Sequence, residues 1–308
     1  MLLVVGSVAF DSVRTPFGER ERMLGGSAVH FSLAASLFTE VGVVGRVGDD
    51  FGDAELEVLH RRGIDTGKLE QVEGGSTFFW RGHYDFDLNT AHTDATELGV
   101  FADFQPDLSD QAADADLLFL GNIQPDLQRH VREQCDQAKL VALDSMNLWI
   151  ETARDSLVGA IRGVDMVFMN DAEIRMLTEE PNLVRAARAL MELGPRVVVA
   201  KQGEYGAALF TSDGFFALPA FPLETVADPT GAGDSFAGGF LGYLAGEGGS
   251  PDEGALRRGM AYGTTVASFC VEGFGTERLG SVTRDEVEER AAAIAAMTRI
   301  EGAQASLP

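Results

Sequence analysis

The chain has 308 residues, of which 45% are hydrophobic, enough to bury the core of one large α/β domain or two smaller ones. Its 48 acidic and 24 basic residues give a net charge of −24, which disfavours nucleic acid and anionic membranes as partners. No apolar run reaches the roughly 18 residues of a membrane span, and the start has the pattern of a buried strand rather than a signal peptide.

Short apolar runs alternate with segments of helical period along most of the chain. Such alternation predicts an α/β fold with a mostly parallel central sheet and helices on both faces. The predicted strands are 2–6, 41–47, 117–120, 140–143, 166–169 and 197–200, followed by a hairpin of 207–211 and 215–218. The predicted helices are 27–38, 53–62, 126–137, 150–162, 172–178, 183–193, 231–246, 252–271 and 283–300.

Two stretches, 12–24 and 68–104, carry strand patterns without intervening helices. Within the second, residues 77–84 are rich in aromatics on both faces, including Trp80 and Tyr84. Such a surface needs cover from the protein on one side and from a substrate or second subunit on the other. We expect a single domain over 1–308 in which these stretches form insertions; the alternative is that they are ordinary strands of the main sheet.

Polar residues repeatedly follow the predicted strands. In α/β sheets ligands gather outside the carboxyl ends of the strands, so these residues are candidates for a binding site. They are Asp11, the Gly25-Gly26 pair, Asn122, Asp144, Asn147, Asn170, Glu173 and Lys201. Two bland alternatives stand beside this hypothesis: Asp11 as a turn residue, and Asn170 as the N-cap of the next helix.

The most informative segment is 228–240, Asp-Pro-Thr-Gly-Ala-Gly-Asp-Ser-Phe-Ala-Gly-Gly-Phe. A turn of small residues, Gly231, Ala232 and Gly233, runs directly into a predicted helix. The first helical turn offers N–H groups without intrahelical partners, and glycines let an anion approach them closely. Asp234 follows at once, where a carboxylate could accept a proton from a hydroxyl that attacks a bound phosphate. The alternative is a simple helix cap.

With four further motifs, this segment resembles the signature of the ribokinase-like, or PfkB-type, carbohydrate kinase family. The motifs are Gly25-Gly26-Ser27, residues 43–52 (Val-Val-Gly-Arg-Val-Gly-Asp-Asp-Phe-Gly), Asn170-Asp-Ala-Glu173, and Lys201-Gln-Gly203-Glu-Tyr-Gly206. They occur in the family's order and span nearly the whole chain. The resemblance implies a three-layer fold with a small β-sheet lid, often used for dimerisation. It also implies transfer of the ATP γ-phosphate to a neutral sugar-like acceptor.

The resemblance also implies residue roles. Asp234 would be the base, and Gly231, Ala232 and Gly233 the anion hole. The acceptor would meet Asp11, Gly25, Gly26 and His30, the lid residues Trp80 and Tyr84, and the strand-end residues Asn122, Asp144 and Asn147. ATP would lie along Asn170, Lys201, Gly203, Gly206 and Thr230, with Tyr262, Gly263 and Val266 beside the adenine. Asn170 and Glu173 would order Mg²⁺ through water, with a monovalent cation such as K⁺ as an open addition.

One departure from the family pattern concerns the acceptor. Four residues after the glycine pair the family commonly has Asn, whereas this chain has His30. A neutral histidine offers one donor and one acceptor with a different reach, so a sugar, a nucleoside and a cyclitol all stay open. A pseudokinase that binds ligands without chemistry is the rival from another class, disfavoured by Asp234 beside an intact glycine turn. The lid of the resembled family implies a homodimer. Neither cysteine has metal-ligand spacing, so we expect both to be reduced, buried thiols in a cytoplasmic protein.

The acidic excess has two explanations. We favour a solvated surface suited to a salt-rich cytoplasm over ordinary variation in an acidic protein. The basic residues are almost all arginine, because only Lys68, Lys139 and Lys201 are lysines.

Overall fold

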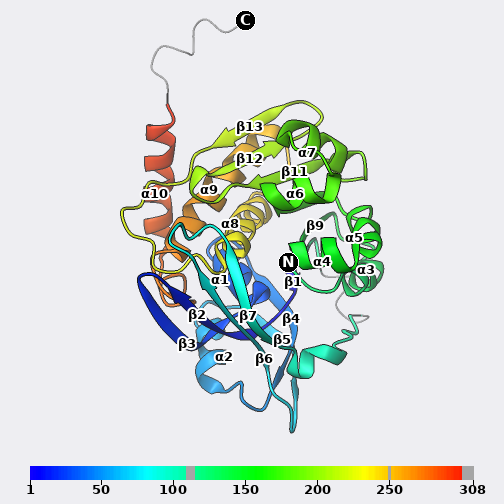
Figure 1. The fold of residues 1–308 in the computed structure, drawn as a ribbon, viewed down its shortest axis with the longest axis vertical. Helices are drawn as coiled ribbons and strands as arrows, with labels where there is room; N and C mark the ends of the chain where they lie inside the picture. Colours follow the sequence, from blue (N-terminus) through cyan, green and yellow to red (C-terminus); the bar gives the residue numbers. More distant parts are fainter. Residues whose placement is uncertain (109–114, 249–250, 300–308) are drawn as a thin grey trace, which may run out of the picture.

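A nine-stranded sheet between two layers of helices forms the body of the protein, and a four-stranded sheet lies against one side of it (Figure 1). The computed structural model describes residues 1–108, 115–248 and 251–299. In spatial order the large sheet comprises β13 (Phe215–Leu218), β12 (Ala207–Phe210), β11 (Val197–Lys201), β10 (Met166–Asn170), β9 (Leu140–Asp144), β8 (Leu117–Leu120), β1 (Leu2–Val5), β4 (Val41–Gly48) and β5 (Asp65–Val72).

The strands from β11 to β5 are parallel, and β12 and β13 add an antiparallel hairpin. Because both faces of a parallel sheet are covered, its central strands are mostly apolar and their alternate side chains enter opposite cores, whereas the edge strand β5 is largely polar. In β1, Leu2 and Val4 belong to one core, whereas Leu3 and Val5 belong to the other. The α/β fold with a mostly parallel central sheet is therefore confirmed.

The helices divide between the two faces. One face carries α1 (Ser27–Ala35), α2 (Asp53–His60), α8 (Ala232–Gly246), α9 (Glu253–Cys270) and α10 (Arg284–Met297). The other carries α3 (Pro125–Gln134), α4 (Asn147–Thr152), α5 (Arg154–Ile161), α6 (Asp171–Thr178) and α7 (Leu183–Met191). The predicted helix 150–162 is in fact two helices, separated at Ala153, whose extended φ of −144° interrupts the helical path.

Helices α1 and α8 approach each other closely because α8 presents glycines to α1. A Cβ built on Gly238 would stand 2.3 Å from the carbonyl oxygen of Phe31, and one on Gly242 would stand 2.8 Å from Cα of Ala35. Larger side chains at these positions would push the helices apart. The glycines that follow the Gly231–Gly233 turn therefore fix the position of α8 against the core.

The four-stranded sheet is the predicted lid. Its order is β3 (Gly18–Gly25), β2 (Ala9–Thr15), β6 (Phe78–Tyr84) and β7 (Ala91–Glu97). The predicted boundaries need two corrections. Residues 68–72 belong to β5 at the edge of the main sheet, where they continue the parallel pairing with β4, and the lid already begins at Ala9.

The motif at residues 43–52 anchors the two connections of the β6–β7 hairpin to the body. Asp50 accepts hydrogen bonds at 2.8 and 2.6 Å from the backbone N–H and the hydroxyl of Thr77, just before β6. Arg46 forms a double ion pair with Glu70 and donates at 3.0 Å to the carbonyl of Asp103, after β7. This motif therefore fixes both ends of the β6–β7 hairpin to the main sheet.

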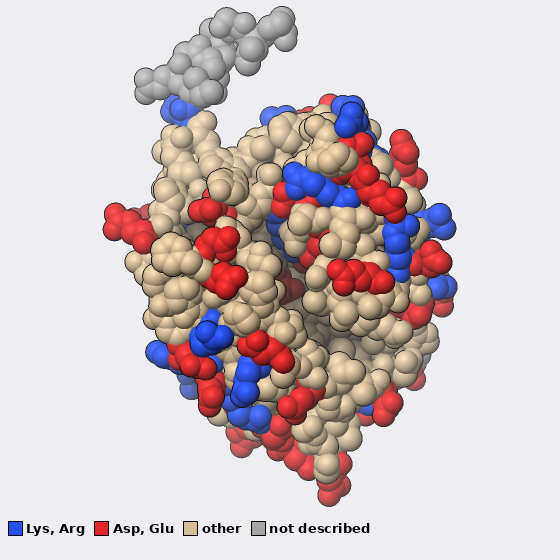
Figure 2. All heavy atoms as spheres, viewed as in Figure 1, with Lys and Arg blue, Asp and Glu red and all other residues tan. Residues whose placement is uncertain are grey.

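Acidic side chains are spread over the face shown in Figure 2 rather than gathered into one patch. Many of them pair with arginines, as in Arg61 with Glu57 and Arg185 with Glu180, but acids outnumber bases two to one. In the part of the chain that the structure describes, no helix is long and apolar enough to cross a membrane.

The unbalanced surface charge predicts that salt stabilises the fold. Repulsion among exposed carboxylates weakens as the screening length falls to roughly 3 Å at about 1 M salt. We therefore expect the Tm to rise steadily from low salt to about 1 M KCl. Calorimetry over this series checks the prediction, and a flat or falling Tm would show that the acidic excess is not a salt adaptation.

Candidate active site

The glycine turn forms the N-terminus of α8, as predicted. Gly231 is the N-cap residue and has φ of +75°, a left-handed conformation that suits glycine. The helix then starts at Ala232, and Ser235 N–H donates to the carbonyl of Gly231 at 2.8 Å. The turn therefore presents the N–H groups and the positive end of a 15-residue helix to one point in space.

Asp228 stabilises this turn through hydrogen bonds to backbone N–H groups. It is 1% exposed and accepts hydrogen bonds from the backbone N–H groups of Thr230 at 2.9 Å and Gly275 at 3.1 Å. Its place within the motif 228–240 does not by itself reveal this role. Its two carboxylate oxygens tie the turn to the segment that connects α9 with α10.

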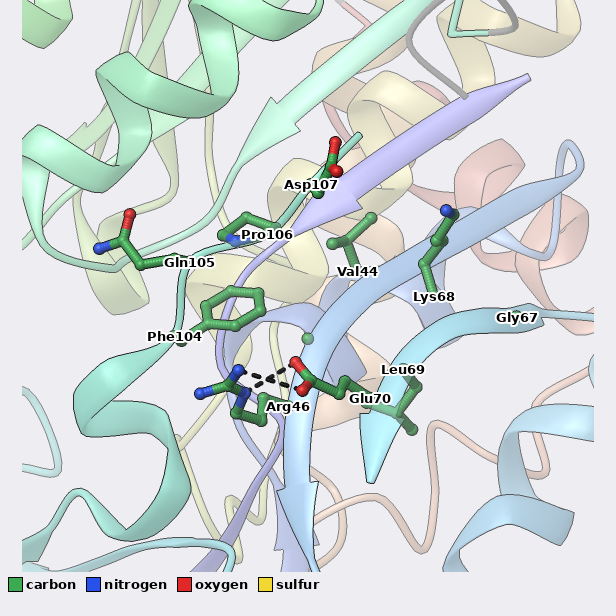
Figure 3. Close-up of a pocket in the computed structure, with 11 residues that line it drawn as sticks. Val44, Arg46, Gly67, Lys68, Leu69, Glu70, Phe104, Gln105, Pro106 and Asp107 are labelled. Atoms are coloured by element: carbon green, nitrogen blue, oxygen red, sulfur yellow. Dashed lines mark hydrogen bonds and ion pairs between the residues drawn. The ribbon is translucent and has the colours of Figure 1, made fainter. Parts of the chain in front are cut away.

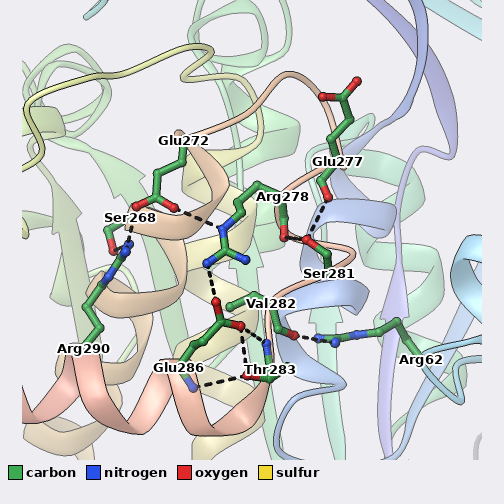
Figure 4. A network of polar contacts seen from close by, with 10 residues as sticks. All are labelled: Arg62, Ser268, Glu272, Glu277, Arg278, Ser281, Val282, Thr283, Glu286 and Arg290. Atoms are coloured by element: carbon green, nitrogen blue, oxygen red, sulfur yellow. Dashed lines mark hydrogen bonds and ion pairs between the residues drawn. The ribbon is translucent and has the colours of Figure 1, made fainter.

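That connecting segment is itself fixed by an ionic network (Figure 4). Arg278 donates to Glu272 at 3.2 Å and to Glu286 at 2.7 Å, while Arg290 donates to Glu272 at 2.7 Å. Glu286 also closes the capping box of α10 with Thr283. The network connects α9, α10 and the loop between them. It therefore fixes the loop in which Gly275 N–H donates to Asp228.

Charged groups from two strands meet at the turn. Lys201, the last residue of β11, forms a largely buried ion pair with Asp144, the last residue of β9. A Cβ built on Gly233 would stand 2.9 Å from Nζ of Lys201, so the ammonium lies directly over the turn. The structure thus brings Asp144, Lys201, Gly233 and Asp234 together, as expected for residues at the carboxyl ends of parallel strands.

Burial perturbs the ionisation of this cluster. It raises the pKa of Asp234 to about 7, with Asp144 adding to the rise and Lys201 opposing it. It raises the pKa of Glu173 to about 7 in the same way. Burial opposes the charge of Lys201, but the carboxylates of Asp144 and Glu173 outweigh it and raise the lysine pKa. The ammonium of Lys201 therefore interacts with the carboxyl groups of Asp144, Glu173 and Asp234. The raised pKa allows Asp234 to gain or lose a proton near neutral pH.

Asn170 and Glu173 lie beside this cluster and bind each other. Asn170 is the N-cap of α6: its Oδ1 accepts from Glu173 N–H at 2.7 Å, and Glu173 Oε2 accepts from Asn170 N–H at 2.8 Å. The alternative of a helix cap is therefore confirmed for Asn170. Within the described residues no group of three or more His, Cys, Asp or Glu side chains is arranged to hold a metal.

The acceptor side of the predicted site is built on β2 and the start of α1. Asp11 is buried and its Oδ2 accepts from Gly26 N–H at 3.3 Å. Burial raises the pKa of Asp11 to about 7; the Gly26 hydrogen bond opposes the rise, and Asp228 and Asp234 add to it. A Cβ on Gly25 would stand 1.9 Å from Asp11 Oδ2, so the glycine pair leaves room for this carboxylate.

The lid places an aromatic surface beside Asp11. In the pairing of β2 with β6, Asp11 lies opposite Trp80, so the two side chains share one face of the lid sheet. A Cβ on Gly82 would stand 2.2 Å from Cζ2 of Trp80, which shows that the indole lies across Gly82. Trp80 Nε1 donates to Thr93 Oγ1 at 3.1 Å. The indole is therefore held flat against the lid.

The hairpin between β6 and β7 contacts both the glycine turn and the turn after β11. The Tyr84 hydroxyl accepts from Thr230 Oγ1 at 3.2 Å, and a Cβ on Gly203 would stand 2.9 Å from Oδ1 of Asn89. Sequence reasoning missed Asn89, because nothing in the local pattern shows what a hairpin tip will contact. Gly203, with φ of +56°, and Gly206, with φ of +99°, shape the turn after β11.

Tyr262, Gly263 and Val266 lie where α9 packs on neighbouring helices. Tyr262 stacks on Tyr243 at 4.4 Å and donates to Glu288 at 2.7 Å. Gly263 and Val266 are buried where α9 packs on α8, and Val266 is 0% exposed. The position of these three residues beside the adenine stays a prediction.

The strand-end residues Asn122 and Asn147 also differ from the cluster. Asn122 Oδ1 accepts from Trp149 Nε1 at 2.9 Å, and Asn147 is exposed at the start of α4. Within the described part of the chain, neither side chain forms a hydrogen bond with Asp234. Of the predicted strand-end residues, Asp144 therefore stands out as the one tied directly to the charged cluster.

A cavity of about 440 Å³ opens at the other edge of the main sheet, between β4, β5 and residues 104–107 (Figure 3). The Arg46–Glu70 ion pair lies at this cavity, and Phe104 and Lys68 also line it. None of the residues predicted for acceptor or ATP binding is among its lining residues. The cavity therefore belongs to the anchor of the lid rather than to the candidate active site.

The raised carboxyl pKa values predict how stability depends on pH. In the folded, ligand-free protein Asp11, Glu173 and Asp234 keep their protons up to about pH 7, whereas unfolded carboxyls lose theirs near about pH 4. The folded state binds more protons in this window, so the free energy of unfolding falls as pH rises from about 5 to about 8.

Denaturant unfolding of wild type and Asp234→Asn checks this expectation. The variant should match wild type at about pH 5 and be more stable at about pH 8, where it lacks the buried charge. Two parallel pH curves would show that Asp234 does not titrate in this window.

Comparison with known proteins agrees with this architecture. The family model for pfkB family carbohydrate kinases matches residues 3–279. Cytidine kinase of Thermococcus kodakarensis is 33% identical over 269 residues, covering 84% of this chain and 93% of the relative. The nucleoside kinase of Burkholderia thailandensis, solved with inosine, superposes with a TM-score of 0.78 at 22% identity, covering 95% and 97% of the two chains. An E. coli protein related to ribokinase, solved with ATP and Mg²⁺, gives 0.77 at 18% identity, covering 95% and 99%. The chain belongs to the pfkB family of carbohydrate kinases.

Proposed function

We propose that this kinase transfers the γ-phosphoryl group of ATP to a hydroxyl of a nucleoside, with Asp234 as the general base. The observation that supports the chemistry most strongly is the position of Asp234 in the first turn of α8, beside Lys201 and directly after Gly233. Phosphoryl transfer needs positioning, neutralisation of charge and one acceptor for a proton. All three are available at this point.

The residues act as follows in the proposed reaction. Asp234 accepts the proton of the attacking hydroxyl, whose oxygen bonds to the γ-phosphorus as the bond to the ADP oxygen breaks. N–H groups of the turn from Gly231 to Gly233 and the ammonium of Lys201 stabilise the charge on the phosphoryl oxygens. Asn170 and Glu173 would hold Mg²⁺ through water, and the ion would neutralise part of the charge on the phosphates. Asp11 binds hydroxyls of the acceptor.

The acceptor is assigned from the lid. The indole of Trp80 lies flat on the lid, on the face it shares with Asp11, and such a surface suits stacking of a nucleobase while Asp11 holds ribose hydroxyls. The cytidine kinase relative and the inosine-bound structure favour the same class. A free sugar is the second candidate, because the ring face of a sugar can also pack on an indole. An inositol stays a third candidate.

Two further features of the proposal concern assembly and ions. We propose a homodimer through the lid, supported by Phe17 and Phe86 in its loops, which are 61% and 84% exposed. A requirement for K⁺ is open, since the buried carboxylate of Asp228 lies below the anion-binding turn. The pseudokinase alternative fails if a screen of nucleosides, sugars and polyols shows acceptor-dependent ADP release.

Asp234→Asn tests the base. The change keeps the shape of the side chain but removes its ability to take a proton, so kcat should fall by ~10²–10⁴ while ATP binding changes little. In wild type, kcat/KM should rise with pH through about 7 as Asp234 loses its own proton. A coupled ADP-release assay measures both, and a variant that keeps more than about a tenth of wild-type kcat would refute the role.

Trp80→Ala tests the nucleoside assignment. Loss of one stacking surface weakens binding of a base by about 1–3 kcal/mol, so KM for the nucleoside should rise roughly 10- to 100-fold with KM for ATP unchanged. Phe215→Ala, an exposed aromatic on β13 outside the lid, is the control and should leave both constants as they are. If free pentoses are good substrates of wild type and nucleosides are not, the acceptor is a sugar.

A further inference from the structure

His30 packs against the anion-binding turn from inside the protein. It lies in the middle of α1 and is 1% exposed. A Cβ built on Gly231 would stand 2.3 Å from both Cγ and Nδ1 of His30, and 2.5 Å from Cδ2. Because three ring atoms are almost equally close to one position, the flat face of the imidazole meets Gly231, rather than its edge.

A second contact fixes the ring in this place. Nδ1 of His30 lies 3.8 Å from Sγ of Cys270, the last residue of α9, and the same Sγ lies 3.5 Å from the carbonyl oxygen of Thr230. The imidazole is thus enclosed by its own helix, the end of α9 and the turn that starts α8. Through Thr230 this group also meets the lid, because Thr230 Oγ1 donates to Tyr84.

The ring is neutral in this position. Burial lowers the pKa of His30 to about 4, so at neutral pH it adds no positive charge below the phosphates. Its Nε2 has no hydrogen-bond partner among the described residues. A neutral imidazole without a hydrogen bond at Nε2 has two explanations. Either the shape of the ring matters at this position, or a ligand binds to Nε2.

The turn above it needs such support. Gly231 has no side chain and takes a left-handed conformation, so nothing of its own fixes its position relative to α1. A misplacement of about 1 Å at reacting groups can cost roughly 100-fold in rate. A rigid planar surface against Gly231 would fix the position of the N–H groups of the first turn of α8 relative to α1.

We propose that His30 is a positioning residue: the face of its ring supports Gly231 and so sets the anion hole for the transferring phosphoryl group. This differs from the expectation that His30 selects the acceptor. The proposal rests on the proposed kinase reaction, and it concerns the ring surface rather than a hydrogen bond from Nε2.

Four substitutions separate the two roles. His30→Phe and His30→Leu keep an apolar surface under Gly231 without a hydrogen-bonding group, and Leu is the closer in volume. His30→Gln keeps a polar group near the place of Nε2 but removes the ring, and His30→Ala removes both. His130→Ala, an exposed histidine on α3, is the matched control. Each protein is first compared with wild type by thermal unfolding.

For a positioning role, kcat of His30→Ala and His30→Gln should fall roughly 10- to 100-fold, with KM for acceptor and ATP within about twofold of wild type. His30→Phe, which keeps a planar ring, should keep most of kcat, and His30→Leu, which fills the volume without a ring, should lie between His30→Phe and His30→Ala. The proposal is overturned if Phe, Leu and Ala all raise acceptor KM and Gln restores it, because Nε2 would then bind the acceptor. It is overturned equally if all four variants have wild-type kinetics.

Two measurements keep the test decisive when a variant is unstable or when no acceptor is found. In a Gly231→Ala background, His30→Ala should cost less than it does alone, because the two residues act through one contact; additive effects would contradict the proposal. The affinity for ADP with aluminium fluoride, which mimics the transferring group without an acceptor, should fall in His30→Ala more than the affinity for ADP. If wild type transfers phosphate to no acceptor, the proposed function fails, while this binding comparison still tests His30.

Discussion

The ion pair between Lys201 and Asp144 is the interaction on which the site depends. It joins the ends of β11 and β9 at the point where α8 begins, and it places the ammonium over Gly233. Without this cation, Asp144, Glu173 and Asp234 would face one another in a buried space, where desolvation already raises the pKa of the latter two. The lysine therefore makes a concentration of carboxyl groups tolerable and still leaves Asp234 able to exchange a proton.

The helix that carries Asp234 is fixed independently of these charges. Glycines on α8 let it pack directly on α1, Asp228 ties its first turn to Gly275, and arginine–glutamate pairs hold the segment around Gly275. Packing and hydrogen bonds thus decide where the anion hole lies, and electrostatics decides what it can do. The lid adds the third element, since its hairpin contacts both Thr230 and Gly203.

Much of this could be predicted from the sequence, because the alternation of apolar strands and helices fixes which residues end up at the carboxyl edge of the sheet. Asp11, Asp144 and Lys201 were predicted at this edge on that ground, and the structure has all three near Asp234. Contacts that depend on tertiary packing could not be predicted in this way. Spacing alone does not show that Val266 is fully buried against α8, and the contact of Asn89 with Gly203 depends on how far a hairpin reaches. Lys68 was assigned to the lid because an edge strand and a lid strand have the same pattern.

The most direct measurement of the central claim is a crystal structure with a non-hydrolysable ATP analogue, Mg²⁺ and a nucleoside acceptor. The account predicts an acceptor hydroxyl within about 2.6–3.2 Å of an Asp234 carboxylate oxygen and in line with the γ-phosphorus. It also predicts γ-phosphate oxygens at the N–H groups of residues 231–233. A complex with the phosphates held elsewhere, or with the acceptor hydroxyl nearest to a group other than Asp234, would contradict it.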